Sequence, residues 1–213
     1  IISSKDNKKI KEARKLLTKK YRKNSYLIEG FHLLEEALKA GRSIKQIFVE
    51  ENKLTKLTEM IGSEKLLTDL SVNLVSKEVL KSLADSESPQ GLIAEVTKIE
   101  EVIDFSAAKF LLLENVQDPG NVGTMIRTAD AAGFSAVILL GETADIYSPK
   151  VMRSMQGSNF HLPLVRMAKE DCFAQLKKAG ISILTTTLSA NSVSYKIINE
   201  PHFALIMGNE GRS

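Results

Sequence analysis

The most informative part of the chain is residues 110–140, which read FLLLENVQDPGNVGTMIRTADAAGFSAVILL. Two strongly apolar runs, Phe110–Leu113 and Ala136–Leu140, lie on either side of a more polar segment. Neither run alternates polar and apolar side chains, which is typical of strands buried on both faces of a parallel sheet. The segment between them predicts a loop and then a helix over about 121–132, ended by Gly133. We therefore predict a β-α-β unit.

The same alternation continues toward the C-terminus. The pattern predicts a helix at 169–179 and strands at 181–186 and 203–207. We therefore expect an α/β domain with a parallel sheet over residues 110–213. Residues 98–109 are weakly patterned, and we interpret them as a linker.

Helices and strands also alternate over the first 97 residues. Apolar spacing and cap residues predict three helices, at 7–20, 31–40 and 76–83, the last capped by Ser76. Strands are predicted at 44–49 and 91–96. Residues 1–97 therefore form a small α/β domain of their own.

The bulk composition excludes several classes of protein. The 213 residues are 43% hydrophobic and 26% charged, as in ordinary soluble domains, and no apolar run is long enough to span a membrane. Cys172 is the single cysteine, so an intrachain disulfide is excluded, and we expect a reducing, cytoplasmic location. Three scattered histidines give no metal-ligand spacing, so we expect no metal site.

Positive charge is concentrated at the N-terminus. Residues 1–25 hold ten Lys or Arg against two acidic residues, although the whole chain carries only +3. A basic end on a nearly neutral body is typical of a protein that contacts a phosphate backbone. The alternative is an ordinary solvated helix face. The candidate phosphate contacts in this region are Lys8, Lys9, Lys19, Lys20 and Arg22.

Residues 114–129 follow a predicted buried strand, at the end of the sheet where ligands bind in open α/β folds. Residues 118–120 predict a tight turn, and Asn121 is a good N-cap for the following helix. Arg127 lies four residues after Gly123 and shares its helix face. A cation near a helix N-terminus is locally unfavourable unless an anion binds there. The alternative is an arginine that pairs with a nearby acidic residue.

Two further segments are weaker signals. Met207–Gly211 holds two glycines directly after a predicted strand, which allows a ligand to approach the backbone closely. Arg153–Ser158 predicts a turn that faces RNA or a second subunit. No G-x-G-x-x-G follows Leu113 and no Walker sequence occurs, which argues against a nucleotide-dependent oxidoreductase.

Together these segments resemble the SpoU family of RNA ribose methyltransferases, part of the knotted SPOUT class. The first motif of that family reads N-x-x-D-P-x-N-x-G-x-x-x-R-T-A. Every fixed position of it is matched here, by Asn115, Asp118, Pro119, Asn121, Gly123, Arg127, Thr128 and Ala129. The second motif is similar to residues 206–211, and residues 27–30 and 89–94 resemble the substrate-binding domain of the family.

The resemblance implies a particular α/β fold. The N-terminal domain would have a ribosomal-protein-like fold, and the C-terminal domain would be a SPOUT domain with a trefoil knot. The third motif of the family, which completes the knot and surrounds the adenine of the cofactor, is not present in these residues. We therefore expect the SPOUT domain to be truncated before its knot is completed.

The resemblance also implies the activity, which is methylation of a ribose 2′-hydroxyl in rRNA or tRNA by a homodimer that uses S-adenosylmethionine. Arg127 would stabilise the attacking oxygen, Asn115 and Asn121 would orient the ribose, and Glu210 or an RNA phosphate would take the proton. The implied cofactor contacts are Gly208, Asn209, Gly211, Thr186 and Leu188. Arg153 would join the N-terminal basic residues in binding RNA.

The main alternative is a non-catalytic RNA-binding or ribosome-assembly protein. Such a protein would keep the basic N-terminal domain but would not need Arg127 or Glu210. Because both residues are present, the sequence favours the enzyme.

Overall fold

The structure is a computed structural model that describes residues 1–62, 68–185 and 201–208. The chain divides into two compact units. The first unit contains Ile1–Ile99 and Tyr147–Gly157, and the second contains Glu100–Ile146 and Ser158–Ser213. The sequence placed all of residues 110–213 in one domain, whereas residues 147–157 pack within the first unit.

The first unit is built on a four-stranded mixed sheet with strand order β1-β4-β2-β3. The strands are β1 (Ser25–Glu29), β2 (Ile44–Glu50), β3 (Val72–Val75) and β4 (Leu92–Thr97). Strand β4 is antiparallel to both of its neighbours, while β2 and β3 are parallel. The predictions of β2 and β4 are confirmed. The sequence missed β1 and β3, because such short runs show too little alternation to predict a strand.

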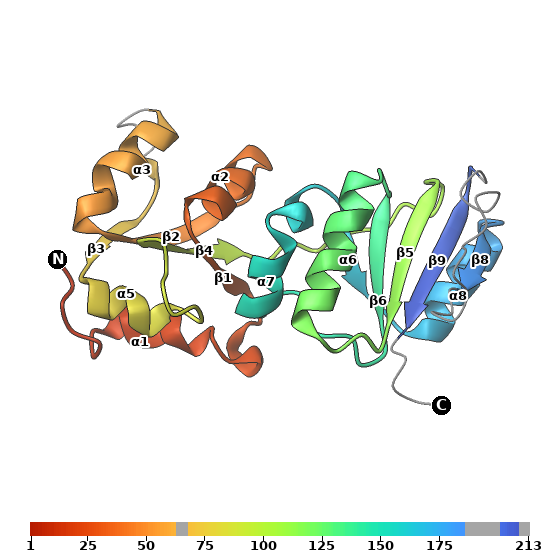
Figure 1. Cartoon of the computed structure of the whole chain (residues 1–213), viewed down its shortest axis with the longest axis horizontal. Coiled ribbons are helices and arrows are strands. Elements are labelled where there is room, and N and C mark those ends of the chain that lie inside the picture. The colour runs from red at the N-terminus through yellow and green to blue at the C-terminus, as the bar shows by residue number, and fades with distance from the viewer. Residues whose placement is uncertain (63–67, 186–200, 209–213) are drawn as a thin grey trace. The chain divides into compact units, whose positions relative to one another are not determined.

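Helices lie on both faces of this sheet, with α2 and α3 on one face and α1 and α5 on the other (Figure 1). They are α1 (Lys8–Lys15), α2 (Phe31–Lys39), α3 (Leu54–Ile61) and α5 (Lys77–Leu83). The Ser76 hydroxyl accepts a hydrogen bond from the Val79 N–H at 3.2 Å, so the predicted cap is confirmed. Helix α1 is shorter than predicted, and a separate 3-10 turn, Lys19–Tyr21, follows it. The sequence missed α3.

A hydrophobic core fills the space between the sheet and the helices α1 and α5. Ile10 from α1 and Leu80 from α5 are fully buried in the same cluster as Phe48 of β2 and Ile93 of β4. Each such side chain contributes about 1.5–3 kcal/mol of transfer free energy. The helically spaced apolar residues of α1 therefore form the face that packs in the core, and its lysines lie on the remaining surface. Helix α7 (Pro149–Met155), which the sequence did not predict, packs against β1.

The second unit is built on a five-stranded parallel sheet with strand order β7-β6-β5-β9-β8. Its strands are β5 (Lys109–Glu114), β6 (Ala136–Leu140), β7 (Leu164–Arg166), β8 (Ser182–Thr185) and β9 (Phe203–Gly208). All five residues of β6 are buried, as the unbroken apolar run predicted. The parallel sheet is confirmed. Only β7 was missed, because three residues form no recognisable period.

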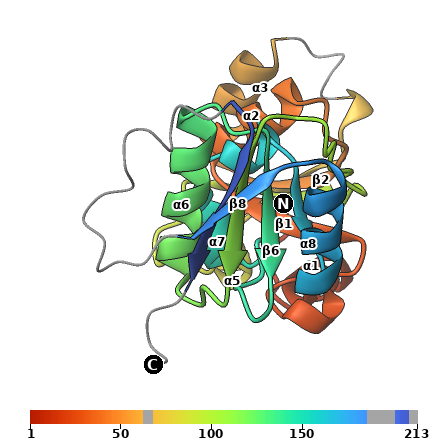
Figure 2. The same ribbon diagram turned by 90° about the vertical axis from the view of Figure 1, so that its right-hand side faces the viewer.

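Two helices cover opposite faces of the parallel sheet, as Figure 2 shows. They are α6 (Pro119–Ala131) and α8 (Lys169–Lys178). Leu112 of β5 packs in one cluster with Leu176 of α8, whereas its neighbour Leu111 faces a hollow beside α6. Alternate side chains of one strand therefore pack against two different helices, which explains why the strand is apolar throughout.

The order of the strands creates a reversal point at the centre of the sheet. From β5 the chain continues to β6 and β7 on one side, while β8 and β9 lie on the other side. Ligands in open α/β sheets bind beside the carboxyl ends of the strands at such a point. Glu114 at the end of β5 pairs with Gly208 at the end of β9, so the two polar motifs begin side by side.

No helix in the described part of the chain is long and apolar enough to cross a membrane.

Candidate active site

The loop after β5 begins helix α6 with a well-formed cap. The Asp118 carboxylate accepts a hydrogen bond from the Asn121 N–H at 2.8 Å, and Pro119 occupies the first helical position. The prediction that Asn121 is the N-cap is therefore wrong, and Asp118 holds that role. The physical reason is that the fixed φ of Pro119 is already helical, so the helix begins two residues earlier. Asn121 lies in the first turn with its side chain exposed.

Arg127 lies on α6 eight residues after Pro119, which is about two helical turns. The helix dipole acts mainly within the first turn, so it does not explain the placement of this cation. Arg127 is exposed, and its side chain makes no hydrogen bond or ion pair with any other residue that the structure describes. The alternative of an arginine paired with a nearby acid thus has no support among these residues.

Asn115 directly follows β5 and has a left-handed backbone conformation, with φ of 55°. Its side-chain oxygen accepts a hydrogen bond from the Glu142 N–H at 2.7 Å. A Cβ at Gly141 would lie 2.3 Å from that oxygen, so this approach requires a glycine. Asn115 therefore joins the loop after β5 to the loop after β6.

Thr143 connects the same two loops through a buried hydroxyl. It is 4% exposed, and its hydroxyl lies 2.8 Å from the Leu113 carbonyl oxygen and 2.9 Å from that of Leu140. The hydroxyl also accepts a hydrogen bond from the Val116 N–H at 3.3 Å. A single buried hydroxyl therefore satisfies backbone groups from both strand ends, which restricts their movement.

Arg166 holds the loop after β6 from β7. Its guanidinium donates to the carbonyl oxygens of Gly141 at 2.9 Å and Ala144 at 3.1 Å, and also to that of Thr143. The sequence analysis missed both Thr143 and Arg166. No local pattern marks them, because their importance depends on strands that are adjacent only in the fold.

Gly208 is the last residue of β9 and is exposed beside Glu114. A Cβ at this position would make an ordinary contact, at 3.8 Å from the Glu114 carbonyl oxygen. The packing of the described residues does not require a glycine here, and the exposed backbone at the strand reversal suits a cofactor held by backbone groups. Five other predicted site residues lie outside the described residues, namely Thr186, Leu188, Asn209, Glu210 and Gly211.

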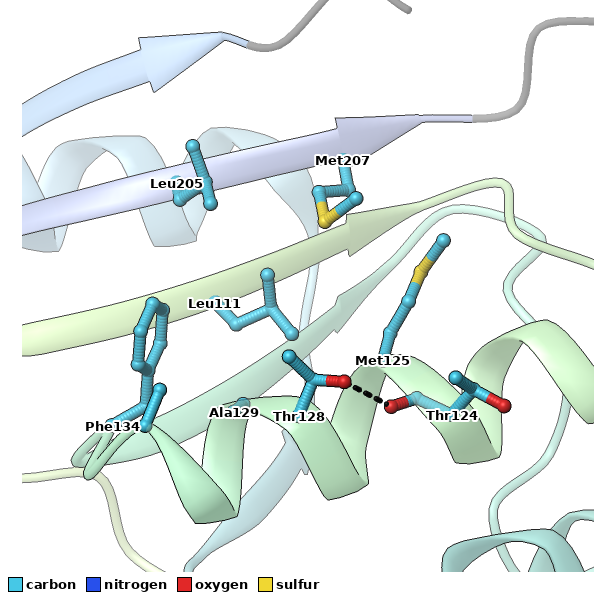
Figure 3. Close-up of a pocket in the computed structure, with 9 residues that line it drawn as sticks. Leu111, Thr124, Met125, Thr128, Ala129, Phe134, Leu205 and Met207 are labelled. Carbon is cyan, nitrogen blue, oxygen red and sulfur yellow. Dashed lines mark hydrogen bonds between the residues drawn. The ribbon is translucent and has the colours of Figure 1, made fainter. Parts of the chain in front are cut away.

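An apolar hollow of about 170 Å³ lies between α6 and the strands β5 and β9 (Figure 3). Leu111, Leu205 and Met207 of the strands face Met125 of α6 across it. The lining is apolar apart from two threonines, and the Thr128 hydroxyl donates to the Thr124 carbonyl oxygen at 2.9 Å. The hollow offers apolar surface but no charged group.

Comparison with known proteins agrees with this geometry. Residues 108–213 match the SpoU rRNA Methylase family, and residues 7–94 match the MRM3-like substrate binding domain. The chain is 42% identical over 212 residues to the 23S rRNA (guanosine(2553)-2'-O)-methyltransferase RlmP of Bacillus subtilis, covering 99% of this chain and 82% of that protein. The chain belongs to the SpoU rRNA methylase family. The predicted family is confirmed.

Solved structures support the same assignment for this SpoU methylase. A crystal structure of an rRNA methyltransferase from Sinorhizobium meliloti gives a TM-score of 0.82 at 29% identity, covering 100% of this chain and 83% of that one. An AdoMet-bound structure from that organism also gives 0.82, at 31% identity over 99% of this chain and 81% of that one. The predicted SPOUT fold class is confirmed. As a family member, the protein is an S-adenosylmethionine-dependent RNA methyltransferase, as its first motif predicted.

The predicted RNA contacts of this SpoU methylase differ in how exposed their side chains are. Lys8, Lys9, Lys19 and Lys20 are exposed on α1 and the 3-10 turn that follows it. The Lys20 ammonium lies 5.1 Å from the ring centroid of Tyr21, which is 45% exposed. An exposed aromatic ring among lysines offers a stacking surface as well as charge. The sequence analysis did not single out this tyrosine.

Arg22 differs from the four lysines. It is 5% exposed, and its guanidinium donates to the Leu16 carbonyl oxygen at 3.0 Å. The interpretation of Arg22 as an RNA contact is therefore wrong, because the side chain is buried as part of the fold. The basic run alone does not distinguish a buried arginine from an exposed one.

Arg153 also differs from the expectation. Its guanidinium lies 2.9 Å from the Glu29 carboxylate and 2.9 Å from the Asp85 carboxylate, all within the first unit. Burial lowers the pKa of Arg153, but the hydrogen bonds to Glu29 and Asp85 outweigh burial and raise that pKa above its ordinary value. Its positive charge is neutralised by these acids, so it is not free to attract a phosphate as the sequence implied.

Proposed function

We propose that this SpoU methylase transfers the methyl group of S-adenosylmethionine to a ribose 2′-hydroxyl of ribosomal RNA. The observation that carries the proposal is an exposed Arg127 on α6, the helix that follows the loop after β5, whose side chain has no partner among the described residues. The name of the Bacillus subtilis relative favours a guanosine of 23S rRNA as the target. Homodimerisation and a cytoplasmic location are parts of the same proposal.

Methyl transfer to a hydroxyl is an in-line displacement, in which negative charge develops on the attacking oxygen. Alignment of the reacting groups can supply roughly 7–11 kcal/mol. Arg127 is effectively always protonated, so it stabilises the developing oxyanion and does not act as the base. An RNA phosphate or the Glu210 carboxylate accepts the proton.

The two asparagines of the first motif have different roles in this proposal. The side-chain oxygen of Asn115 is already bonded to the Glu142 N–H, so Asn115 is a positioning residue that holds the loop. The side chain of Asn121 is exposed on the first turn of α6 and has no partner among residues 1–62, 68–185 and 201–208. Asn121 is therefore free to bind the ribose.

The cofactor would be held largely by backbone groups. Gly208 presents its backbone at the end of β9, and the remaining proposed contacts are Asn209, Gly211, Thr186 and Leu188. When bound, S-adenosylmethionine supplies an electrophilic methyl group. The contribution of the protein is to hold that group in line with the ribose oxygen.

Arg127→Ala tests the proposal directly. We expect turnover to fall at least about a hundredfold, because an oxyanion-stabilising donor is lost. RNA affinity should stay within a few fold, since the lysines at the N-terminus are unchanged. The measurement is mass spectrometry of rRNA treated with the full-length protein, together with RNA binding.

Lys177→Ala is the matched control, because it removes an exposed positive charge on α8, which lies on the other face of the sheet. It should behave like the wild type. Near-normal turnover by the Arg127→Ala variant would refute the role of this residue. RNA binding by the wild type without any methylation would favour a binding protein over an enzyme.

A further inference from the structure

The first unit contains a cavity of about 300 Å³ that the proposed function does not use. It lies where the end of β1, the start of α2, the loop before β4 and the end of α7 meet. The polar groups that line it come from Glu29, His32, Ser86, Ser88, Gln90, Arg153 and Gln156. It differs from the apolar hollow beside α6, because most of the residues that line it have polar side chains.

Charge in this cavity opposes a phosphate. The Glu29 side chain is only 7% exposed, and it is fixed by Arg153 and by the Ser86 hydroxyl at 2.9 Å. Asp85 binds the same guanidinium, so two carboxylates surround one arginine. The excess of negative charge repels phosphate groups and favours ligand edges that donate hydrogen bonds.

Free hydrogen-bonding groups remain on the cavity wall. Ser88 and Gln90 are exposed, and neither side chain bonds to another residue in the described ranges. A glutamine amide matches the paired donors and acceptors on the edge of a nucleobase. Leu33 and Pro89 add apolar surface, against which a flat ring can pack.

The end of α7 is held in a strained conformation beside this cavity. Gln156 has φ of 49°, which is unusual for a residue other than glycine. Its carbonyl oxygen lies 3.2 Å from His32 Nε2, so the strained turn and the start of α2 are joined. Backbone strain of this kind is common at ligand sites.

We propose that this cavity binds an unpaired nucleobase of the substrate RNA by its hydrogen-bonding edge. Sequence-specific RNA recognition usually targets unpaired bases, which offer such edges together with a stacking face. The first unit would then contribute base selection, whereas the lysines of α1 contribute attraction that does not depend on sequence. The inference rests on the proposed function, since it requires an RNA substrate.

Gln90→Ala and Ser88→Ala, alone and combined, test the proposal. The probe is a 23S rRNA fragment that spans the nucleotide methylated by the wild type. Its affinity for the full-length protein is measured by fluorescence anisotropy at several salt concentrations. We expect the double variant to bind roughly tenfold more weakly. The salt slope should not change, because counterion release comes from phosphate contacts.

Gln175→Ala on α8 is the matched control, since that glutamine is also exposed and lies in the other unit. It should bind like the wild type, and thermal unfolding should show that all variants remain folded. A weaker affinity with a reduced salt slope would identify a phosphate contact and overturn the proposal. Unchanged affinity in the double variant would also overturn it.

The same samples separate this inference from the proposed function. Methyl incorporation by the wild type tests the enzyme alone. If the wild type methylates the fragment and the double variant matches it in affinity and rate, only the base pocket is refuted. If the wild type binds and methylates no RNA, both proposals fail.

Discussion

Asn115 shows how a single residue shapes the active-site loops. Its left-handed backbone costs a residue with a Cβ roughly 1–2 kcal/mol, although asparagine tolerates it better than most. Its side-chain oxygen accepts a hydrogen bond from the Glu142 N–H, which connects the loops that follow β5 and β6. Neither property is visible in the motif, where Asn115 is only the first fixed letter.

Asn115→Ala should lower both stability and catalysis. The variant keeps an unfavourable backbone conformation and leaves the Glu142 N–H without its partner, which together cost about 1–2 kcal/mol. Asn115→Gly relieves the strain but still lacks the hydrogen bond, so it should be more stable than Asn115→Ala. Thermal unfolding measures the stability difference.

The same pair of variants tests whether Asn115 positions the loop for catalysis or contributes only to stability. Both should lower kcat more than they raise KM for RNA, because the loop is displaced while the lysine surface is intact. Equal stability of the two variants would contradict the assigned backbone strain. A wild-type kcat in both would contradict the positioning role.

At the scale of elements, helix α6 carries Arg127, the proposed catalytic arginine, and depends on its first turn for its start. Asp118 caps the helix, and Pro119 sets its direction as it leaves the loop. The motif therefore contains residues with a structural task, such as Asp118, beside residues available to substrate, such as Arg127.

Asp118→Ala should destabilise the second unit by about 0.5–2 kcal/mol, because the cap of α6 is lost. Asn121→Ala should leave stability nearly unchanged and should lower activity instead. Denaturant unfolding of the two variants, measured in parallel with methyl transfer, checks this separation. If Asn121→Ala lost more stability than Asp118→Ala, Asn121 would be the N-cap, as the sequence predicted.

At the scale of the whole molecule, the excess of positive over negative charge is concentrated in residues 1–25. The four exposed lysines lie on α1 and the turn after it, while Arg22 and Arg153 are occupied within the first unit. Fewer basic side chains are therefore available to bind RNA than we predicted from the sequence.

Replacing Lys8, Lys9, Lys19 and Lys20 with glutamine should weaken RNA binding and flatten its salt dependence. Each phosphate contact contributes about 0.7–0.9 to the slope of log K against log salt, so the loss of four contacts should lower the magnitude of the slope by up to about 3.6. Binding titrations over a salt series provide the measurement. Lys177→Gln and Lys178→Gln on α8 serve as the control. If the variant that lacks the four N-terminal lysines has the same salt slope as the wild type, those lysines do not contact phosphates and are only a solvated surface.

Much of this fold could be predicted from the sequence, because periodicity and caps act locally. The unbroken apolar runs at Phe110 and Ala136 specified strands of a parallel sheet, and the first motif identified the family. The short strands β1, β3 and β7 and the helices α3 and α7 escaped prediction, since few residues carry too little local signal.

The residues themselves determined the longer helices and strands, the family and the place of Arg127 on the helix after the first motif's loop, because those properties depend on neighbours in the chain. Tertiary structure alone decided that Thr143 and Arg166 hold the active-site loops, that Arg22 is buried, and that Arg153 is paired with Glu29. The physical reason is that each of these roles requires partners far away in sequence, which only the packed fold brings into contact.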